Sequence, residues 1–110
     1  MKPGKRNLEI TRGDDYPHEI RFEDSAGDPV DKSGCTYRAQ IRTRAADEDD
    51  IAFDIDDSQL AGGILVLSLD AAATRDLPTV AVWDLEQTAP TPRTTTLLSG
   101  SVVVREDVTR

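Results

Sequence analysis

The sequence predicts an all-β fold, either a β-sandwich or a closed barrel of about seven short strands. Apolar residues recur mostly with a period of two, which is typical of a half-buried strand rather than of a helix. Clusters of Gly, Pro, Asp and Ser separate these alternating stretches at short intervals. The length of 110 residues suits one domain, since domains commonly hold roughly 100–150 residues.

The N-terminal part contains three alternating stretches. Residues 7–11 place Leu8 and Ile10 on one face, and residues 18–23 do the same with apolar residues at every second position. The third stretch, residues 35–42, carries basic side chains on its other face. Turn-forming residues separate the three predicted strands, at 12–17, 24–29 and 31–34.

The C-terminal part continues the pattern. Residues 51–56 and 64–69 alternate and are joined by a Gly-containing turn, so a hairpin is predicted. Asp70 is a good helix N-cap, and a short helical turn is expected at 70–76 because the residue before Pro78 disfavours the α region. Two further strands are expected at 80–86 and 95–104, with Gly100 as a candidate bulge in the second.

The apolar phase of each strand predicts the core. The first predicted strand, 7–11, and the last, 97–105, are the expected sheet edges, where unpaired main-chain groups are open to strand addition. The predicted core consists of Ile10, Ile20, Phe22, Tyr37, Ile41, Phe53, Leu67, Leu69, Trp83, Leu85 and Val102.

Charge and composition exclude several classes of protein. Lys and Arg number 13 against 21 Asp and Glu, a net charge of −8, so nucleic acid is not an expected partner. The apolar runs are far shorter than the roughly 20 residues that span a bilayer, and no secretory signal follows the basic N-terminus, so no membrane partner is expected. The single cysteine, Cys35, provides neither an intrachain disulfide nor a structural zinc site.

A family resemblance rests on the turn and strand segments at residues 7–14, 24–27, 29–31, 33–34, 37–42, 63–69, 77–78 and 83–86. Together these segments resemble the small β-sandwich structural proteins of tailed bacteriophages and prophages, and in particular the N-terminal anchoring domain of siphophage upper baseplate proteins. This resemblance implies a single immunoglobulin-like antiparallel β-sandwich that belongs to a virion, is assembled in the bacterial host cytoplasm, docks onto other structural proteins and performs no chemistry. The sequence departs from the family pattern at Thr79-Val80 and at residues 89–93.

Residues with catalytic side chains lack the partners that catalysis needs. His18 is the only histidine and shares a strand face with Ile20, which favours a half-buried structural role. Cys35 has no neighbouring histidine or cationic cluster to activate its thiol, and it begins an apolar face. Trp83 alternates with apolar neighbours as a sandwich core residue does. We therefore expect no enzyme and no cofactor.

Two motifs have a functional and a structural interpretation. The acidic stretch 47–57 offers carboxylates for calcium, but its apolar residues alternate as in a strand and it lacks the spacing of a calcium loop, so a solvated hairpin is expected and no metal site. The tripeptide Arg12-Gly13-Asp14 resembles an adhesion motif, yet it coincides with a turn that uses Gly and Asp for backbone reasons.

Basic side chains are the candidate partner-binding residues, and they divide into two groups. A flexible basic arm is expected at 1–6, followed by the sandwich domain at 7–105 and a C-terminal tail at 106–110. On an acidic chain, such basic sites are compatible with head-to-tail contacts between copies. The candidates are Lys2, Lys5 and Arg6 in the arm and Arg38, Arg42 and Arg44 along the third predicted strand.

The expected function is that of a non-enzymatic virion protein that binds other virion proteins and further copies of itself. A capsid-decoration or minor capsid role and a tail or baseplate adaptor role both fit. The rival hypothesis is a free-standing module that binds a host surface or carbohydrate, for which the five aromatic residues, one Trp, two Tyr and two Phe, are few.

Overall fold

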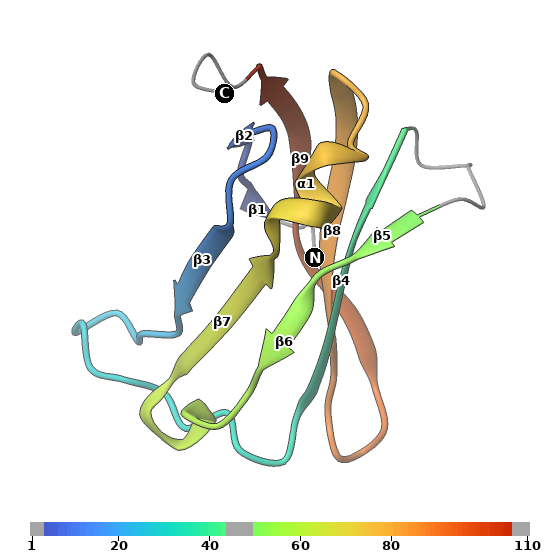
Figure 1. Cartoon of the computed structure of the whole chain (residues 1–110). Helices are drawn as coiled ribbons and strands as arrows, with labels where there is room; N and C mark the ends of the chain where they lie inside the picture. Colours follow the sequence, from blue (N-terminus) through green and yellow to red (C-terminus); the bar gives the residue numbers. More distant parts are fainter. Residues whose placement is uncertain (1–3, 44–49, 107–110) are drawn as a thin grey trace.

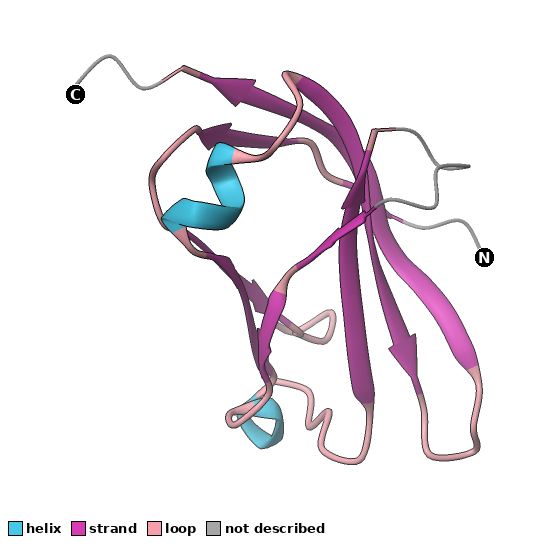
Figure 2. Ribbon diagram, turned by 45° about the vertical axis from the view of Figure 1, so that its right-hand side comes forward, coloured by secondary structure: helices cyan, strands magenta, loops and turns pink. Residues whose placement is uncertain are grey.

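In the computed structural model, which describes residues 4–43 and 50–106, two β-sheets lie face to face (Figure 1 and Figure 2). The six-stranded sheet has the order β1-β9-β8-β4-β5, with β2 also paired to β9, and the three-stranded sheet has the order β3-β7-β6. The predicted all-β sandwich is confirmed. The strands are β1 (Gly4–Lys5), β2 (Leu8–Thr11), β3 (Tyr16–Arg21), β4 (Thr36–Arg42), β5 (Asp50–Ala52), β6 (Asp54–Asp56), β7 (Ile64–Leu69), β8 (Val80–Thr88) and β9 (Thr94–Arg105).

The core lies between the two sheets, and the strand periodicity explains it. Along β7 and β8, buried residues alternate with partly exposed ones, as expected for strands with one face inward. Among the predicted core residues, Ile20, Phe22 and Tyr37 are only partly buried, and the others are buried. The core residues that were not predicted are Leu8, Ala39, Leu60, Leu65, Leu77, Ala81, Val104 and the polar Thr74.

The sandwich is not antiparallel throughout, because β1 and β2 both pair with β9 in parallel. Parallel neighbours require a long connection, and here nearly the whole chain lies between the first strands and the last. The N-terminal strand β2 is an edge strand as predicted. The prediction of an edge at 97–105 is wrong for residues 98–99 and 102–103, since β1 and β2 cover them on one side and β8 on the other.

The predicted flexible arm is wrong for residues 4–6, which belong to the six-stranded sheet. The N–H of Arg6 donates to Ser99 O at 2.9 Å, and the indole Nε1 of Trp83 donates to Arg6 O at 2.7 Å. Gly100 permits this approach, because a Cβ at Gly100 would lie 2.1 Å from Arg6 O. The contact is made by main-chain atoms, so the polar side chains of the arm gave no sign of it. Residues 1–3 lie outside the described residues.

The predicted hairpin between 51–56 and 64–69 is only half correct. β6 pairs antiparallel with β7, but β5 pairs with β4 in the other sheet. Phe53 lies at the crossing, where its N–H donates to Ala39 O at 3.0 Å and its ring is buried. A single alternating stretch therefore joins the two sheets along one side of the sandwich.

The predicted helical turn is confirmed as α1 (Ala71–Arg75), capped by the Asp70 side chain, and a second short helix, η1, spans Leu60–Gly62. α1 lies at one end of the sandwich (Figure 2). The turn at Arg12-Gly13-Asp14 contacts it: the Gly13 N–H donates to the hydroxyl of the fully buried Thr74, and that hydroxyl lies 2.9 Å from Asp14 O. The tripeptide thus attaches α1 to the sheet.

Candidate docking surface

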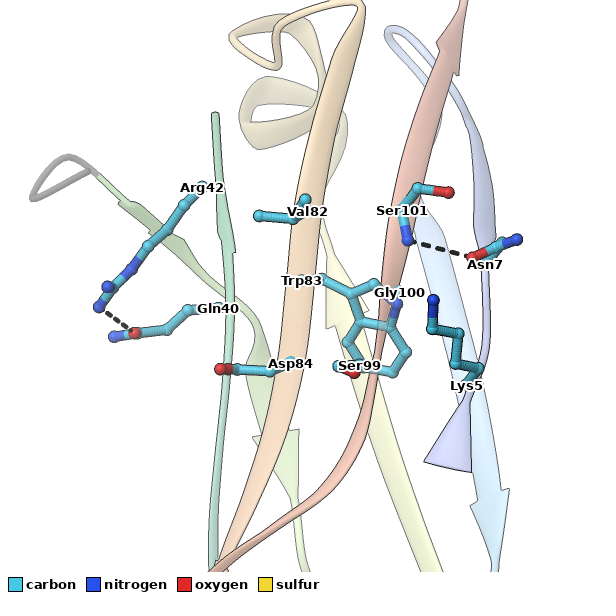
Figure 3. A pocket seen from close by; sticks show the side chains of 10 residues that line it. All are labelled: Lys5, Asn7, Gln40, Arg42, Val82, Trp83, Asp84, Ser99, Gly100 and Ser101. Carbon is cyan, nitrogen blue, oxygen red and sulfur yellow. Dashed lines mark hydrogen bonds between the residues drawn. The ribbon is translucent and has the colours of Figure 1, made fainter. Parts of the chain in front are cut away.

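The outer face of the six-stranded sheet contains a shallow depression of about 530 Å³, seen from close by in Figure 3. Its walls come from β1, β9, β8 and β4, together with the link between β1 and β2. Polar side chains dominate because these are the outward positions of the strands. The lining residues are Lys5, Asn7, Gln40, Arg42, Val82, Trp83, Asp84, Ser99, Gly100 and Ser101.

Local contacts hold the polar groups of this depression in place. Asn7 Oδ1 accepts from the Ser101 N–H at 3.1 Å, which fixes the start of β2 against β9. On the opposite side, Arg42 donates to Gln40 Oε1 at 2.9 Å, across two positions of β4 (Figure 3). The two basic side chains, Lys5 and Arg42, therefore lie on opposite sides of the depression.

Asp84 lies on β8, between these two basic side chains in the strand order. Burial raises the pKa of Asp84 above its ordinary value of 3.8, and nearby Glu86 adds to the rise. Arg42 and Arg38 oppose it, because a positive charge favours the carboxylate. The surface thus alternates basic, acidic and basic groups across the four neighbouring strands β1, β9, β8 and β4, a pattern that suits a charge-complementary partner.

The structure separates the predicted partner-binding residues. Lys5 and Arg42 share the depression. Arg38 is exposed on the same sheet face, across from Glu86 in the β4–β8 register. Arg6 instead lines a groove between the two sheets. The remaining two, Lys2 and Arg44, lie outside the described residues.

Sequence reasoning missed the uncharged members of the depression and its one acid. Asn7, Gln40, Asp84, Ser99 and Ser101 occupy the polar phase of their strands, which is the pattern of any solvated face. Only the order of the strands brings them together. Gly100 is the one signal that the sequence offered, since a glycine within a strand marks a close approach of another backbone.

The residues with catalytic side chains have structural surroundings. His18 is half-buried; its ring stacks on Tyr16 and meets the Trp83 ring edge-on. Burial lowers the pKa of His18, and the positive charge of Arg6 lowers it further. The buried Nε2 of His18 has no hydrogen-bond partner within the described part of the chain. Cys35 is a free, half-buried thiol. The half-buried position of His18 confirms the prediction from the sequence.

Residues 4–43 and 50–106 contain neither grouped metal ligands nor a helix that could span a membrane. In these ranges, no three His, Cys, Asp or Glu side chains gather closely enough to hold a metal ion. Part of the acidic stretch considered for calcium, residues 47–49, lies outside these ranges. The described helices, η1 and α1, are too short to cross a bilayer.

Fold and surface together define a β-sandwich structural domain with a polar sheet face. The LtfC-like, beta-sandwich domain family matches residues 2–105, and the chain belongs to this family. The match supports the coarser form of the resemblance, a β-sandwich domain of the phage structural class. A solved structure titled "Crystal structure of the Lin-41 filamin domain" is similar at 14% identity, with 81% of each chain covered and a TM-score of 0.40. A comparison with curated proteins gave no match.

Proposed function

We propose that the chain is a non-enzymatic structural module of a phage virion that docks onto neighbouring virion proteins. The observation that carries this proposal is the match of residues 2–105 to the LtfC-like, beta-sandwich domain family. Function in such a module depends on its surface rather than on a cleft. Capsid decoration, a minor capsid role and a tail or baseplate adaptor, including an upper baseplate anchor, are the finer forms of the proposal.

The outer face of the six-stranded sheet is the proposed docking surface. Lys5 and Arg42 flank Asp84 there, and Arg38 lies further along β4. Oppositely charged groups on a partner would match this pattern and fix its orientation, while added salt would weaken the attraction. Lys2, Arg6 and Arg44 complete the set of proposed contacts with virion proteins or with further copies of the chain.

Quantitative mass spectrometry of purified particles tests the proposal. Tens to hundreds of copies per particle would indicate the capsid or tail tube, and a handful would indicate the tail tip or connector. Absence of the chain from purified particles would contradict the virion assignment.

A charge-reversed double variant, Lys5→Glu with Arg42→Glu, tests the docking surface. We expect it to fold normally, because both changes are on the solvent side of the sheet. We expect it to be depleted from particles, because the charges at the proposed contact are reversed. Arg93→Glu, exposed in the loop between β8 and β9, is the matched control and should be incorporated as the unmodified chain is. Equal incorporation of both variants would show that the depression is not the contact.

One observation favours the rival hypothesis of a carbohydrate-binding module. The depression offers amide, carboxylate and hydroxyl groups of Asn7, Gln40, Asp84 and Ser101, which are suitable partners for sugar hydroxyls. Trp83 argues against it, since the residue is only 3% exposed and is part of the core, where its ring cannot stack on a sugar. Specific binding to a glycan array that Asp84→Asn abolishes would favour the carbohydrate hypothesis over docking.

A further inference from the structure

A second cavity lies between the two sheets, on the side of the sandwich away from the β5–β6 crossing. It has a volume of about 510 Å³, and its walls are β3 from one sheet and β8 and β9 from the other. Five of its nine lining residues are apolar and four are charged. The lining residues are Arg6, Glu19, Ile20, Arg21, Phe22, Lys32, Leu85, Leu97 and Leu98. We call this cavity the inter-sheet groove.

A free strand edge forms one border of the inter-sheet groove. β3 pairs only with β7, so the other side of β3 has no strand beside it in the described part of the chain (Figure 1). The Phe22 N–H donates to Gly63 O at 2.7 Å, which places Phe22 in the hydrogen-bonded phase of this antiparallel pair. By alternation, the main-chain groups of Glu19 and Arg21 point away from β7. Pro17, which has no N–H, occupies the same outward phase.

The opposite side of the sandwich is closed. There the chain runs directly from β5 in one sheet to β6 in the other, and the Phe53 N–H donates to Ala39 O. A partner strand therefore has an apolar groove and an open strand edge together only on the β3 side of the described structure. This asymmetry selects one place for strand addition.

Charge around the inter-sheet groove is opposite in sign to that of the chain. Three cations, Arg6, Arg21 and Lys32, line it against one acid, Glu19, although the chain has a net charge of −8. Glu19 is already matched, because its Oε2 lies 3.4 Å from the Arg21 guanidinium. The Lys32 ammonium lies 5.1 Å from the centre of the Phe22 ring. The site thus combines an apolar floor with an excess of positive charge.

We propose that the inter-sheet groove binds an extended segment of a partner protein, added to β3 as a further strand, in which apolar residues alternate with Asp or Glu. The proposal rests on the docking function proposed above for its choice of a protein partner. In antiparallel addition, the apolar side chains point inward over Ile20 and Leu97. The acidic side chains point outward, with one opposite Arg21. The main-chain groups of Glu19 and Arg21 then form the hydrogen bonds.

Synthetic peptides test the proposal with the whole chain. The probe is an eight-residue peptide of alternating Val and Asp with both ends blocked, and the control peptide replaces every Asp with Lys. We expect the acidic peptide to bind, and to shift the amide signals of Glu19 and Arg21 in a nitrogen-15 NMR titration, while those of Asp84 and Ser101 stay unchanged. The Lys peptide should not bind. No binding of the acidic peptide up to millimolar concentration, or equal binding of both peptides, would overturn the proposal.

Methylation of the peptide amides distinguishes strand addition from simple charge attraction. In antiparallel addition the Asp amides face β3, so N-methylation of every Asp should abolish binding, while N-methylation of every Val should be tolerated. Loss of binding by the Asp-methylated peptide, together with retained binding by the Val-methylated peptide, supports an added strand. Equal effects of the two sets would overturn it.

Protein variants complete the test and separate it from that of the docking function. Arg21→Glu should weaken binding of the acidic peptide roughly tenfold, since a surface attraction becomes a repulsion. Arg93→Glu, with the same change of charge, should bind as the unmodified chain does. A groove that fails these tests in a chain that is still incorporated into particles would refute this inference alone. A chain absent from particles would refute the virion function instead.

Discussion

At the scale of single residues, Gly100 determines how the N-terminus joins the sandwich. Its missing side chain lets the backbone of Arg6 approach, and Trp83 reaches the same carbonyl with its indole N–H. One glycine therefore serves both the sheet and the core. The same close approach forms the base of the depression on the outer sheet face, where Gly100 and Trp83 are lining residues.

We expect Gly100→Ala to destabilise the chain by about 1–3 kcal/mol, because its Cβ would overlap Arg6 O and push residues 6–7 away from β9. Chemical denaturation measures this change. Gly62→Ala is the matched control, since a Cβ there meets nothing within 4 Å and the change should stay within about 0.5 kcal/mol. Equal stability of the two variants would contradict the close approach.

His18 makes stability depend on pH. Its pKa in the folded chain lies below the ordinary 6.5, mainly because burial disfavours the imidazolium. As the pH falls below 6.5, the unfolded chain binds a proton that the folded chain does not, so His18 contributes a loss of stability toward acid. The contribution is fully favourable above 6.5 and declines until the pH passes the folded pKa.

Replacing the histidine isolates this effect. His18→Phe keeps a flat ring against Tyr16 and Trp83 but cannot titrate. We expect the stability difference between the variant and the unmodified chain to shift in favour of the variant as the pH is lowered from 7.5 to 5.5, measured by urea unfolding. Asp84 titrates in both proteins and cancels in the comparison. A difference that stays constant with pH would contradict the lowered pKa.

At the scale of elements, α1 depends on a contact with the turn before β3. Thr74 is fully buried, and its hydroxyl accepts from the Gly13 N–H at 3.0 Å and lies 2.9 Å from Asp14 O. The Arg12 guanidinium also donates to the carbonyl of Arg75, the last residue of the helix, and to that of Leu77 just beyond it. A helix of five residues could not persist alone, so these tertiary contacts hold it.

Thr74→Val should cost about 1–3 kcal/mol, because it removes the part-buried hydrogen bonds to the Gly13 N–H and to Asp14 O while keeping the side-chain shape. Thr74→Ser is the control: it retains the hydroxyl and loses one methyl group, and it should be less harmful. Thermal unfolding compares the three proteins. A valine variant as stable as the serine variant would mean that the hydroxyl contributes little.

How far the sequence predicts the elements depends on the kind of signal. Alternation identified the strands that became β2, β3, β4, β7, β8 and β9, and Asp70 with Pro78 bounded the short helix. The switch of sheets at Phe53 was not predictable, since an alternating stretch looks the same whichever neighbours it pairs with. β1 was missed for a related reason: two exposed residues that contribute only main-chain hydrogen bonds have no apolar pattern.

The charge pattern of the sequence identified some residues of the candidate site, but the sequence did not predict which of them lie together. Lys5 and Arg42 were selected as basic residues on an acidic chain, and the structure places both at one depression. Arg6 was grouped with Lys5, but it follows the end of β1 and lines the inter-sheet groove instead of the depression. Asp84 could not be found, because pairing with β4 and β9, not its sequence neighbours, brings it between the two basic residues.

At the scale of the whole molecule, the two sheets differ in how completely their strands are paired. β8 has partners on both sides from residue 82 to 88, and β9 is covered by β8 and by β1 and β2. The three-stranded sheet has β7 as its one central strand and β3 as an edge. A surface for strand addition thus lies on the smaller sheet, while the larger sheet provides the stable framework and the polar face.

Hydrogen exchange should show this difference directly. We expect the slowest amides at residues 82–88 of β8, since these hydrogen bonds open only when the six-stranded sheet opens. Along β3, exchange should alternate: the Glu19 and Arg21 amides face the open edge and should exchange fast, whereas Ile20 and Phe22 face β7 and should be slow. Amide-resolved NMR measures both patterns. Uniform protection along β3 would mean that its outer edge is already occupied in the free chain, and an added strand would then have to displace that occupant before it could pair.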